Sequence, residues 1–290
     1  MKFAINIPPL DDCADARTLA DFAREAEDAG WDGFFIWDHI ALGWPGAIVD
    51  PIVALAAIAL STERIRIGAL VTPLPRRRPV KFARETASLD RLSGGRLIVG
   101  VGIGLFREEF DHLGEQPDFK IRGAMLDEGL EVLTGLWRGE KFSHEGEHYT
   151  VKDTQFWPTP VQEPRIPIWV AGMWPNKAPL RRAARWDGVY PIPRVTEEQE
   201  LALTPEETKD AVAYVMQHRE GDAPFDVISG GITPGDDPAK AAELIGPYAD
   251  AGATWWQEII HPTRFDWEWG PPPWPMDAMR ERIRQGPPKS

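Results

Sequence analysis

The chain has 290 residues, of which 43% are hydrophobic, and carries a formal net charge of −13. This length suits one large α/β barrel or two small domains, and the hydrophobic content supports a full core. The acidic charge argues against anionic partners, namely nucleic acids and anionic membrane surfaces.

Strand-like and helix-like segments alternate along the whole chain. Short apolar runs predict strands buried on both faces, at residues 2–7, 33–37, 65–70, 97–101, 168–171, 188–190, 225–231 and 255–259. Apolar residues at helical spacing predict helices, at residues 15–29, 51–60, 79–92, 108–113, 122–137, 178–186, 204–219, 238–251 and 276–284. About eight strands alternating with helices is the rhythm of a TIM (β/α)8 barrel. We expect one such domain over residues 1–290.

Three local features refine this prediction. The rival architecture, an open doubly wound sheet, is disfavoured because Pro8-Pro9-Leu10-Asp11, and no GxGxxG, follows the first strand. Thr72 to Pro75 are expected to leave the third strand, because proline cannot donate to a ladder. Residues 138–167 are polar, aromatic and proline-bearing, so we expect an insertion outside the barrel, such as a hairpin.

The cellular setting follows from what the sequence lacks. Cys13 is the only cysteine, so no intrachain disulfide can form, and a reducing cytoplasm is expected. The first ten residues are too short and too soon followed by acids for a signal peptide. No long uncharged apolar segment is available to span a membrane.

The dipeptide Asp38-His39 stands at the carboxyl end of the second predicted strand. Barrels bind ligands at this end, and an imidazole can give or take a proton near neutral pH. We therefore expect His39 to transfer a proton or to bind a planar cofactor. The alternative is a structural histidine held by Asp38.

Further ligand-binding candidates follow other predicted strands. The loops around Thr72 and Gly104 lie at carboxyl ends of strands. Residues 172–177 join a strand to a helix, whose free amides suit a phosphate. Lys177, Arg181 and Arg182 either add positive charge to such a site or form a solvated helix face.

Other motifs narrow the chemistry. His144-Glu145-Gly146-Glu147-His148 is not expected to bind a metal, because the glycine favours a turn over the helix that zinc sites of this spacing use. His261 follows the last strand and lies beside Arg264. Because of this strand-end position, a contact between His261 and the substrate is one of two equally weighted hypotheses. The aromatic residues 261–269 suggest a cover for the barrel mouth and an apolar or planar substrate, or a dimer contact. No Ser-His-Asp signature, GxSxG or P-loop is present, which favours an organic cofactor.

Three stretches together resemble the luciferase-like monooxygenase superfamily. They are Trp37-Asp38-His39, residues 64–104 (RIRIGALVTPLPRRRPVKFARETASLDRLSGGRLIVGVGIG) and residues 166–191 (IPIWVAGMWPNKAPLRRAARWDGVYP). The resemblance covers most of residues 1–190. Asp38-His39 with Trp44 nearby resembles the branch that uses the deazaflavin coenzyme F420.

The resemblance implies a barrel with a flavin or deazaflavin at its carboxyl face, a small-molecule substrate and a homodimer. It also implies a non-prolyl cis peptide, matched to Ala69-Leu70. The cofactor-binding positions that it implies are Asp38, Ala69, Leu70, Thr72, Gly104, Gly172, Met173 and Lys177. One departure concerns the substrate: Leu105 stands where sugar-phosphate dehydrogenases of this branch have a glutamate, and Glu108 and Glu109 are close in sequence.

The resemblance predicts an oxidoreductase that transfers a hydride between F420 and a small organic substrate. His39 is expected to give or take the proton, and Trp44 to shield the developing charge. An FMN-dependent luciferase-like monooxygenase is the first alternative. A cofactor-free barrel that only binds a ligand is the second.

Overall fold

The computed structural model describes residues 1–42, 46–194, 202–267 and 273–288. Its main sheet has nine strands in the order β3-β2-β1-β11-β10-β9-β8-β5-β4, and all neighbours in it run parallel. The strands are β1 (Lys2–Ile7), β2 (Gly33–Ile36), β3 (Arg66–Ala69), β4 (Thr72–Pro73), β5 (Val99–Gly102), β8 (Ile168–Met173), β9 (Gly188–Ile192), β10 (Asp226–Gly231) and β11 (Trp255–Ile259).

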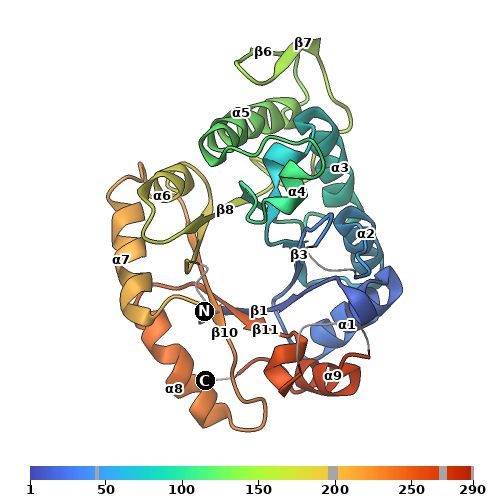
Figure 1. The fold of residues 1–290 in the computed structure, drawn as a ribbon, viewed down its shortest axis with the longest axis vertical. Helices are drawn as coiled ribbons and strands as arrows, with labels where there is room; N and C mark the ends of the chain where they lie inside the picture. The colour runs from blue at the N-terminus through green and yellow to red at the C-terminus, as the bar shows by residue number, and fades with distance from the viewer. Residues whose placement is uncertain (43–45, 195–201, 268–272, 289–290) are drawn as a thin grey trace.

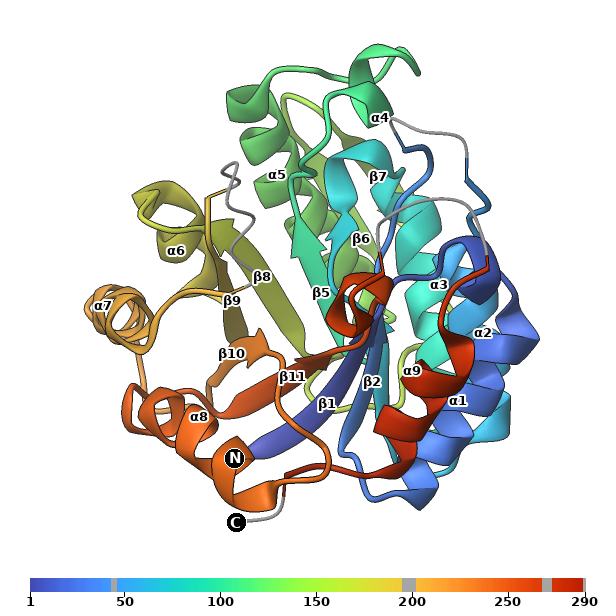
Figure 2. The ribbon, with the colours of Figure 1, turned by 60° about the horizontal axis from the view of Figure 1, so that its bottom comes forward.

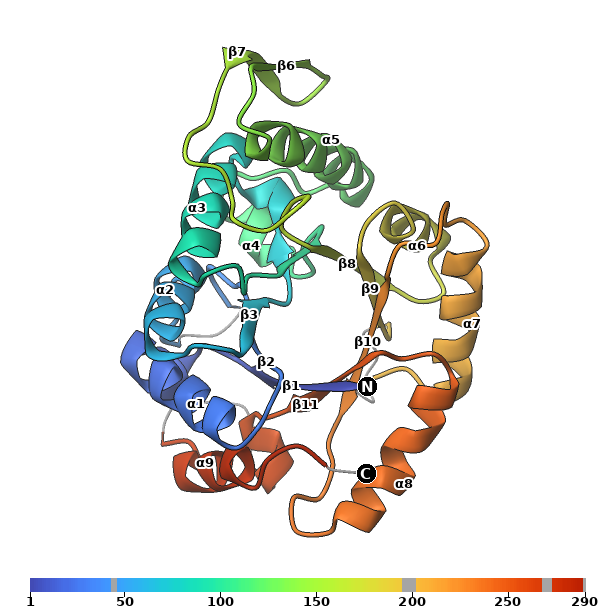
Figure 3. The same ribbon diagram turned by 180° about the vertical axis from the view of Figure 1, so that it is seen from behind.

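The two ends of this sheet meet. Ile67 of β3 bridges to Leu97, just before β5, and the amide of Ile98 donates to the carbonyl of Ile67 at 2.8 Å. Helices surround the strands on the outside (Figures 1 and 3). The predicted TIM-type α/β barrel is therefore confirmed.

The helices begin and end within a few residues of the predicted bounds. They are α1 (Ala16–Asp28), α2 (Pro51–Ser61), α3 (Pro79–Leu92), α4 (Glu108–Asp111), α5 (Phe119–Trp137), α6 (Lys177–Ala183), α7 (Pro205–Met216), α8 (Pro238–Asp250) and α9 (Met276–Arg284), with the 3-10 turns η1 (Asp11–Cys13), η2 (Leu74–Arg76) and η3 (Pro262–Phe265). Helix α5 begins three residues earlier than predicted, because Asp118 caps it by accepting from two of its first amides. Among the described residues, no helix has the length and apolarity needed to cross a membrane.

The third barrel strand is interrupted, and here two predictions were wrong. Thr72 and Pro73 do not leave the sheet but pair with Val101 and Gly102 as β4. Proline is tolerated because β4 has a single neighbour in the sheet, so its missing N–H breaks no ladder. The cis peptide joins Leu70 to Val71, one residue beyond the predicted position. Leu70 still donates its amide to Ile36 at 2.8 Å, so the regular ladder continues through Leu70 and the irregularity follows it.

Aromatic side chains pack together in the lumen of the barrel. The rings of Phe35 and Trp169 lie 5.4 Å apart, and those of Trp169 and Trp255 lie 5.2 Å apart. Alternation along each strand sends every second side chain into the lumen. The residues of this lumen cluster are Ala4, Phe35, Leu70, Ile98, Trp169, Ile228 and Trp255, with Val71 and Tyr190 packed against them.

The predicted insertion is a hairpin, β6 (Phe142–Glu145) and β7 (Thr150–Thr154), which pair antiparallel outside the barrel (Figure 1). Its turn is fastened by Glu128 of α5, whose carboxylate accepts the amides of Glu147, His148 and Tyr149. The prediction for residues 138–167 is confirmed.

Glycines permit the close approach of β5 to the interrupted strand. A Cβ at Gly100 would clash with the backbone oxygen of Ala69, and one at Gly102 would lie 2.9 Å from Cγ2 of Val71. The glycine-rich strand thus serves the approach of one backbone to another.

We predict that Gly100→Ala lowers the free energy of unfolding by about 1–3 kcal/mol, because the backbone opposite cannot move aside. The matched control is Gly246→Ala in α8, where a Cβ meets no atom within 4 Å. That change is expected to be neutral or to stabilise by about 0.5–1 kcal/mol, through helix propensity. Urea denaturation of both variants measures the difference; equal stabilities would contradict the prediction.

Candidate functional site

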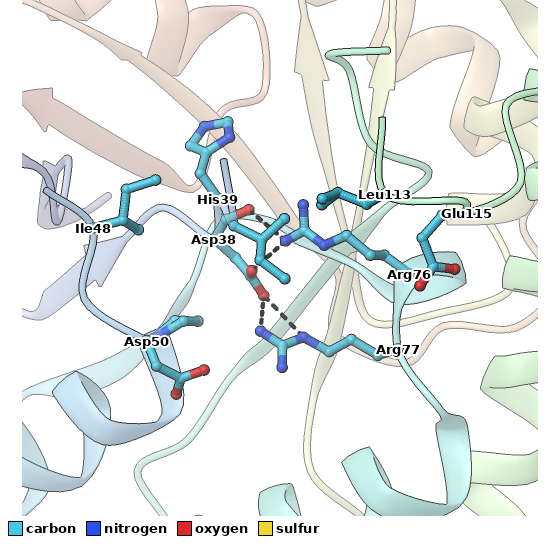
Figure 4. Close-up of a pocket in the computed structure, with 10 residues that line it drawn as sticks. Asp38, His39, Ile48, Asp50, Arg76, Arg77, Leu113 and Glu115 are labelled. Atoms are coloured by element: carbon cyan, nitrogen blue, oxygen red, sulfur yellow. Dashed lines mark hydrogen bonds and ion pairs between the residues drawn. The ribbon is translucent and has the colours of Figure 1, made fainter. Parts of the chain in front are cut away.

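The carboxyl end of β2 delivers Asp38 and His39 to a network of buried charges. Asp38 accepts from Arg76 at 2.7 Å and from Nη2 of Arg77 at 2.7 Å, and its side chain is fully buried. Figure 4 shows both guanidinium groups directed at this carboxylate. Asp38 is therefore occupied by two cations rather than by His39.

Arg76 links Asp38 to a second buried carboxylate, Glu109 of α4. Nη1 of Arg76 lies 2.8 Å from Oε1 of Glu109, whose residue is 1% exposed. The same oxygen accepts the amide of Ile40 at 2.8 Å. Three segments far apart in sequence are thus joined by one guanidinium.

Glu109 also holds the imidazole of His39. Nδ1 of His39 lies 3.2 Å from Oε2 of Glu109, and the centroid of its ring lies 5.9 Å from that of Trp37 and 5.4 Å from that of Phe106. The His39 side chain is 16% exposed. No hydrogen bond engages Nε2 within the described residues, so this nitrogen is available to a ligand.

The protonation of Glu109 decides which histidine nitrogen carries hydrogen. Burial opposes its charged form, but the hydrogen bonds from His39 and Ile40 and the charge of Arg76 outweigh burial and lower its pKa below 4.5. An ionised carboxylate only accepts, so Nδ1 of His39 must donate. Nε2 of the neutral ring then holds a lone pair and can take a proton.

A cavity of about 430 Å³ opens beside this network (Figure 4). Its walls come from the end of β2, the start of α2, the segment after η2 and the segment after α4. The lining residues are Asp38, His39, Ile40, Ile48, Asp50, Pro51, Arg76, Arg77, Leu113 and Glu115.

The other predicted site residues are distributed unevenly around the mouth. Leu70 belongs to the lumen cluster, and Met173 shares the lumen-facing alternation of Trp169 on β8. Ala69 and Thr72 face the helices instead: Ala69 belongs to the outer core, and both residues line a small apolar gap under α2 and α3.

Gly172 and Lys177 are engaged in packing. A Cβ at Gly172 would clash with Pro179 of α6, so this glycine lets helix and strand approach. The ammonium of Lys177 lies 3.8 Å from the ring centroid of Trp174 and 4.2 Å from that of Tyr214. Trp44 lies outside the described residues.

Two arginines considered for an anion site have protein partners. Arg182 donates to both carboxylate oxygens of Asp127, each at 2.8 Å, and Arg181 donates to the hydroxyl of Tyr214 at 2.8 Å. His144 of the hairpin lies 3.5 Å from Glu128. Across the described part of the chain, no three His, Cys, Asp or Glu side chains are grouped to hold a metal.

His261 is buried at the carboxyl end of β11, with its Nδ1 2.7 Å from the hydroxyl of Thr263. Burial, together with the charge of Arg264, lowers its pKa to about 4, so the ring is neutral at pH 7. Arg264, three residues further on, forms an ion pair with Glu258.

Arg122, in the first turn of α5, was missed as a site candidate. Its residue is fully buried, yet none of its three guanidinium nitrogens has a hydrogen-bond partner among the residues that the structure describes. Its guanidinium carbon lies 3.7 Å from the ring centroid of Phe110 and 4.3 Å from that of Phe119. A Cβ at Gly104 would lie 3.2 Å from Nη1. The sequence signal that could have identified Arg122 is its position on the same face of the predicted helix as the apolar residues Leu126, Leu130 and Leu133.

Comparison with known proteins adds independent findings. A sequence model described as luciferase-like monooxygenase matches residues 1–285. An F420-dependent glucose-6-phosphate dehydrogenase of Amycolatopsis mediterranei is 32% identical over 55% of this chain and 48% of its own. The oxygenase component of a flavin-dependent trigonelline monooxygenase of Acinetobacter baylyi is 30% identical over 54% of this chain and 43% of its own.

Among solved structures, monooxygenase RslO1 of Streptomyces bottropensis superposes with a TM-score of 0.77 at 20% identity. The superposition covers 98% of this chain and 97% of that chain, so it shows the same fold. The sequence matches to the two relatives above span less than half of each relative's length.

We predict that Glu109→Gln lowers the free energy of unfolding at pH 7 by about 1–3 kcal/mol, because Arg76 loses a buried carboxylate. The pKa of Glu109 is lower in the folded chain, so its stabilising contribution is full above pH 4.5 and is lost as pH falls through the folded value. The gap between wild type and variant should therefore close in acid. Denaturation at pH 7 and at a series of lower pH values, with exposed Glu108→Gln as control, tests this; a gap that stays unchanged down to the lowest pH at which the wild type is folded would contradict it.

Proposed function

The chain belongs to the luciferase-like monooxygenase family, and on that premise we propose that it is an oxidoreductase that transfers a hydride between F420 and a small organic substrate. One observation carries the proposal: Glu109 fixes Nδ1 of His39 and leaves Nε2 open at the carboxyl end of β2. Proton transfer must accompany hydride transfer, and this nitrogen is placed to perform it.

The cofactor, when bound, supplies the ring carbon that exchanges the hydride. Nε2 of His39 takes or gives the accompanying proton, while Glu109 keeps the other nitrogen protonated. Arg76 keeps Glu109 ionised, so the imidazole does not lose its orientation when its charge changes.

Arg122 supports the presence of a cofactor with an anionic group. A buried guanidinium without hydrogen bonds is costly, and charge-assisted bonds to a phosphate would satisfy it. FMN and F420 both carry a phosphate on the side chain of the ring system, and Arg122 lies against the predicted cofactor-binding Gly104. We propose that Arg122 holds this phosphate.

FMN is the alternative cofactor, because one relative is a flavin-dependent monooxygenase and another is F420-dependent. Titration of the purified apoprotein with each cofactor, followed by tryptophan quenching, separates the two. Binding of neither would favour the cofactor-free ligand-binding barrel. The homodimer and the cytoplasmic location stay predictions; light scattering checks the dimer.

We predict that His39→Ala lowers kcat by about 10²–10⁴-fold, because a positioned acid–base group is lost. Turnover of F420 with a panel of small alcohols and aldehydes provides the assay. The melting temperature should change little, because residues at this face serve function more than stability. His112→Ala, at the exposed end of α4, is the matched control.

Normal turnover per folded molecule with a lowered melting temperature would make His39 structural. A large loss of cofactor affinity with normal turnover at saturation would assign it to cofactor binding instead.

We predict that Arg122→Met weakens FMN and F420 binding by about 10–100-fold, the value of a charged hydrogen-bond pair. Riboflavin, which has the same ring and no phosphate, should bind wild type and variant equally. Arg122→Lys should restore part of the affinity. An equal loss for riboflavin and FMN would show that Arg122 only supports the fold.

A further inference from the structure

Three polar side chains form a hydrogen-bonded relay across neighbouring strands of the barrel. Nε1 of Trp37, which directly follows β2, donates to Oδ1 of Asn6 on β1. Nδ2 of Asn6 donates to Oε1 of Gln257 on β11 at 2.7 Å. Figure 2 shows β2, β1 and β11 side by side, as their pairing requires. We call Trp37, Asn6 and Gln257 the lumen relay.

The indole fixes the direction of every bond in the lumen relay. An indole nitrogen can only donate, so the oxygen of Asn6 must face Trp37 and its nitrogen must face Gln257. The oxygen of Gln257 is thereby engaged, and its amide nitrogen is left at the end. This nitrogen is buried and has no hydrogen-bond partner in the described part of the chain.

The unpaired amide belongs to the lumen. Gln257 shares the alternation of Trp255, a member of the lumen cluster, and is 1% exposed. Its partner in register on β10 is Gly230, which has no side chain to accept its hydrogens. A buried donor left unpaired costs about 1–3 kcal/mol, so a bound acceptor is the straightforward explanation.

The position of the lumen relay favours substrate over cofactor. Except for Asp38, the predicted cofactor-binding residues lie on or next to β3, β4, β5, β8 and α6. The lumen relay lies on β1, on β11 and directly after β2, in the other half of the barrel, together with Asp38 and His39. Because no member of the lumen relay is charged, the complementary group is a neutral oxygen rather than an anion.

We propose that the amide of Gln257 donates to a neutral carbonyl or hydroxyl oxygen of the substrate and so selects small oxygenated molecules. This inference rests on the proposed function for the distinction between substrate and cofactor. Among the apolar or planar substrates predicted from the aromatic residues 261–269, the proposal selects those that carry such an oxygen.

The test uses the full chain and cyclohexanone as the probe. Gln257→Glu keeps the length and the bond from Asn6 but replaces the free donor by an acceptor. Gln217→Glu, at the exposed end of α7, makes the same chemical change remote from the barrel mouth. Ligand-observed NMR measures cyclohexanone affinity with and without cofactor, and side-chain amide spectra follow the Gln257 NH2 signal, assigned by its absence in the variant.

We expect cyclohexanone to shift the Gln257 signal, and Gln257→Glu to weaken its binding at least tenfold while F420 and FMN affinities stay within twofold. Gln217→Glu should behave as wild type. No cyclohexanone binding by wild type, or equal binding by Gln257→Glu, would overturn the proposal. Loss of cofactor affinity in Gln257→Glu would place the acceptor on the cofactor, and would also overturn it.

Failure of the proposed function gives a different result. Wild type would then bind neither F420 nor FMN, whereas a cyclohexanone shift at Gln257 would still support an oxygen-recognising barrel.

Discussion

The guanidinium of Arg76 between two buried carboxylates is the interaction on which the candidate site depends. Asp38 follows β2, Glu109 lies on α4, and Arg76 ends η2. Burying three charges is tolerated only when each has a close partner of opposite sign. This constraint brings the three segments together. His39 is oriented as a consequence, because its Nδ1 bonds to Glu109.

Side chains of very different size pack on the two sides of the barrel beneath this network. Large aromatic rings fill the lumen between β2, β8 and β11, while glycines at positions 68, 100 and 102 bring β3, β4 and β5 together. On the wide side, at β2, β8 and β11, the large rings fill the space between strands. On the narrow side, at β3, β4 and β5, the glycines let the backbones lie close together. The irregular peptide after Leu70 lies on the narrow side, where Gly100 and Gly102 of the neighbouring strand present no side chain to it.

Most of the fold could be predicted from sequence because its signals are local. The short apolar runs of the strands, the capping box at Thr204 and the glycines and prolines at the ends of elements each act within a few residues. The side-chain contacts of the site are not local. Glu109 lies 70 residues from His39 in sequence, and no motif around either residue indicates the other as its partner. Asp38, adjacent to His39, was the natural candidate partner, yet two arginines occupy it. Sequence also misplaced the end of the third strand, since a proline at a strand with one neighbour escapes the rule that excludes it elsewhere.

The hairpin β6–β7 is attached to α5 by the carboxylate of Glu128, which accepts the amides of its turn, and by apolar packing, since Val151 is buried in the core and the ring of Phe142 lies against Gly135. The register of β8, which follows it, is set by pairing with β5 and β9 and owes nothing to the hairpin. Because the hairpin adds no strand to the barrel sheet, we expect that changes in its turn, between Glu145 and Thr150, leave the pairing that builds the mouth of the barrel unaltered.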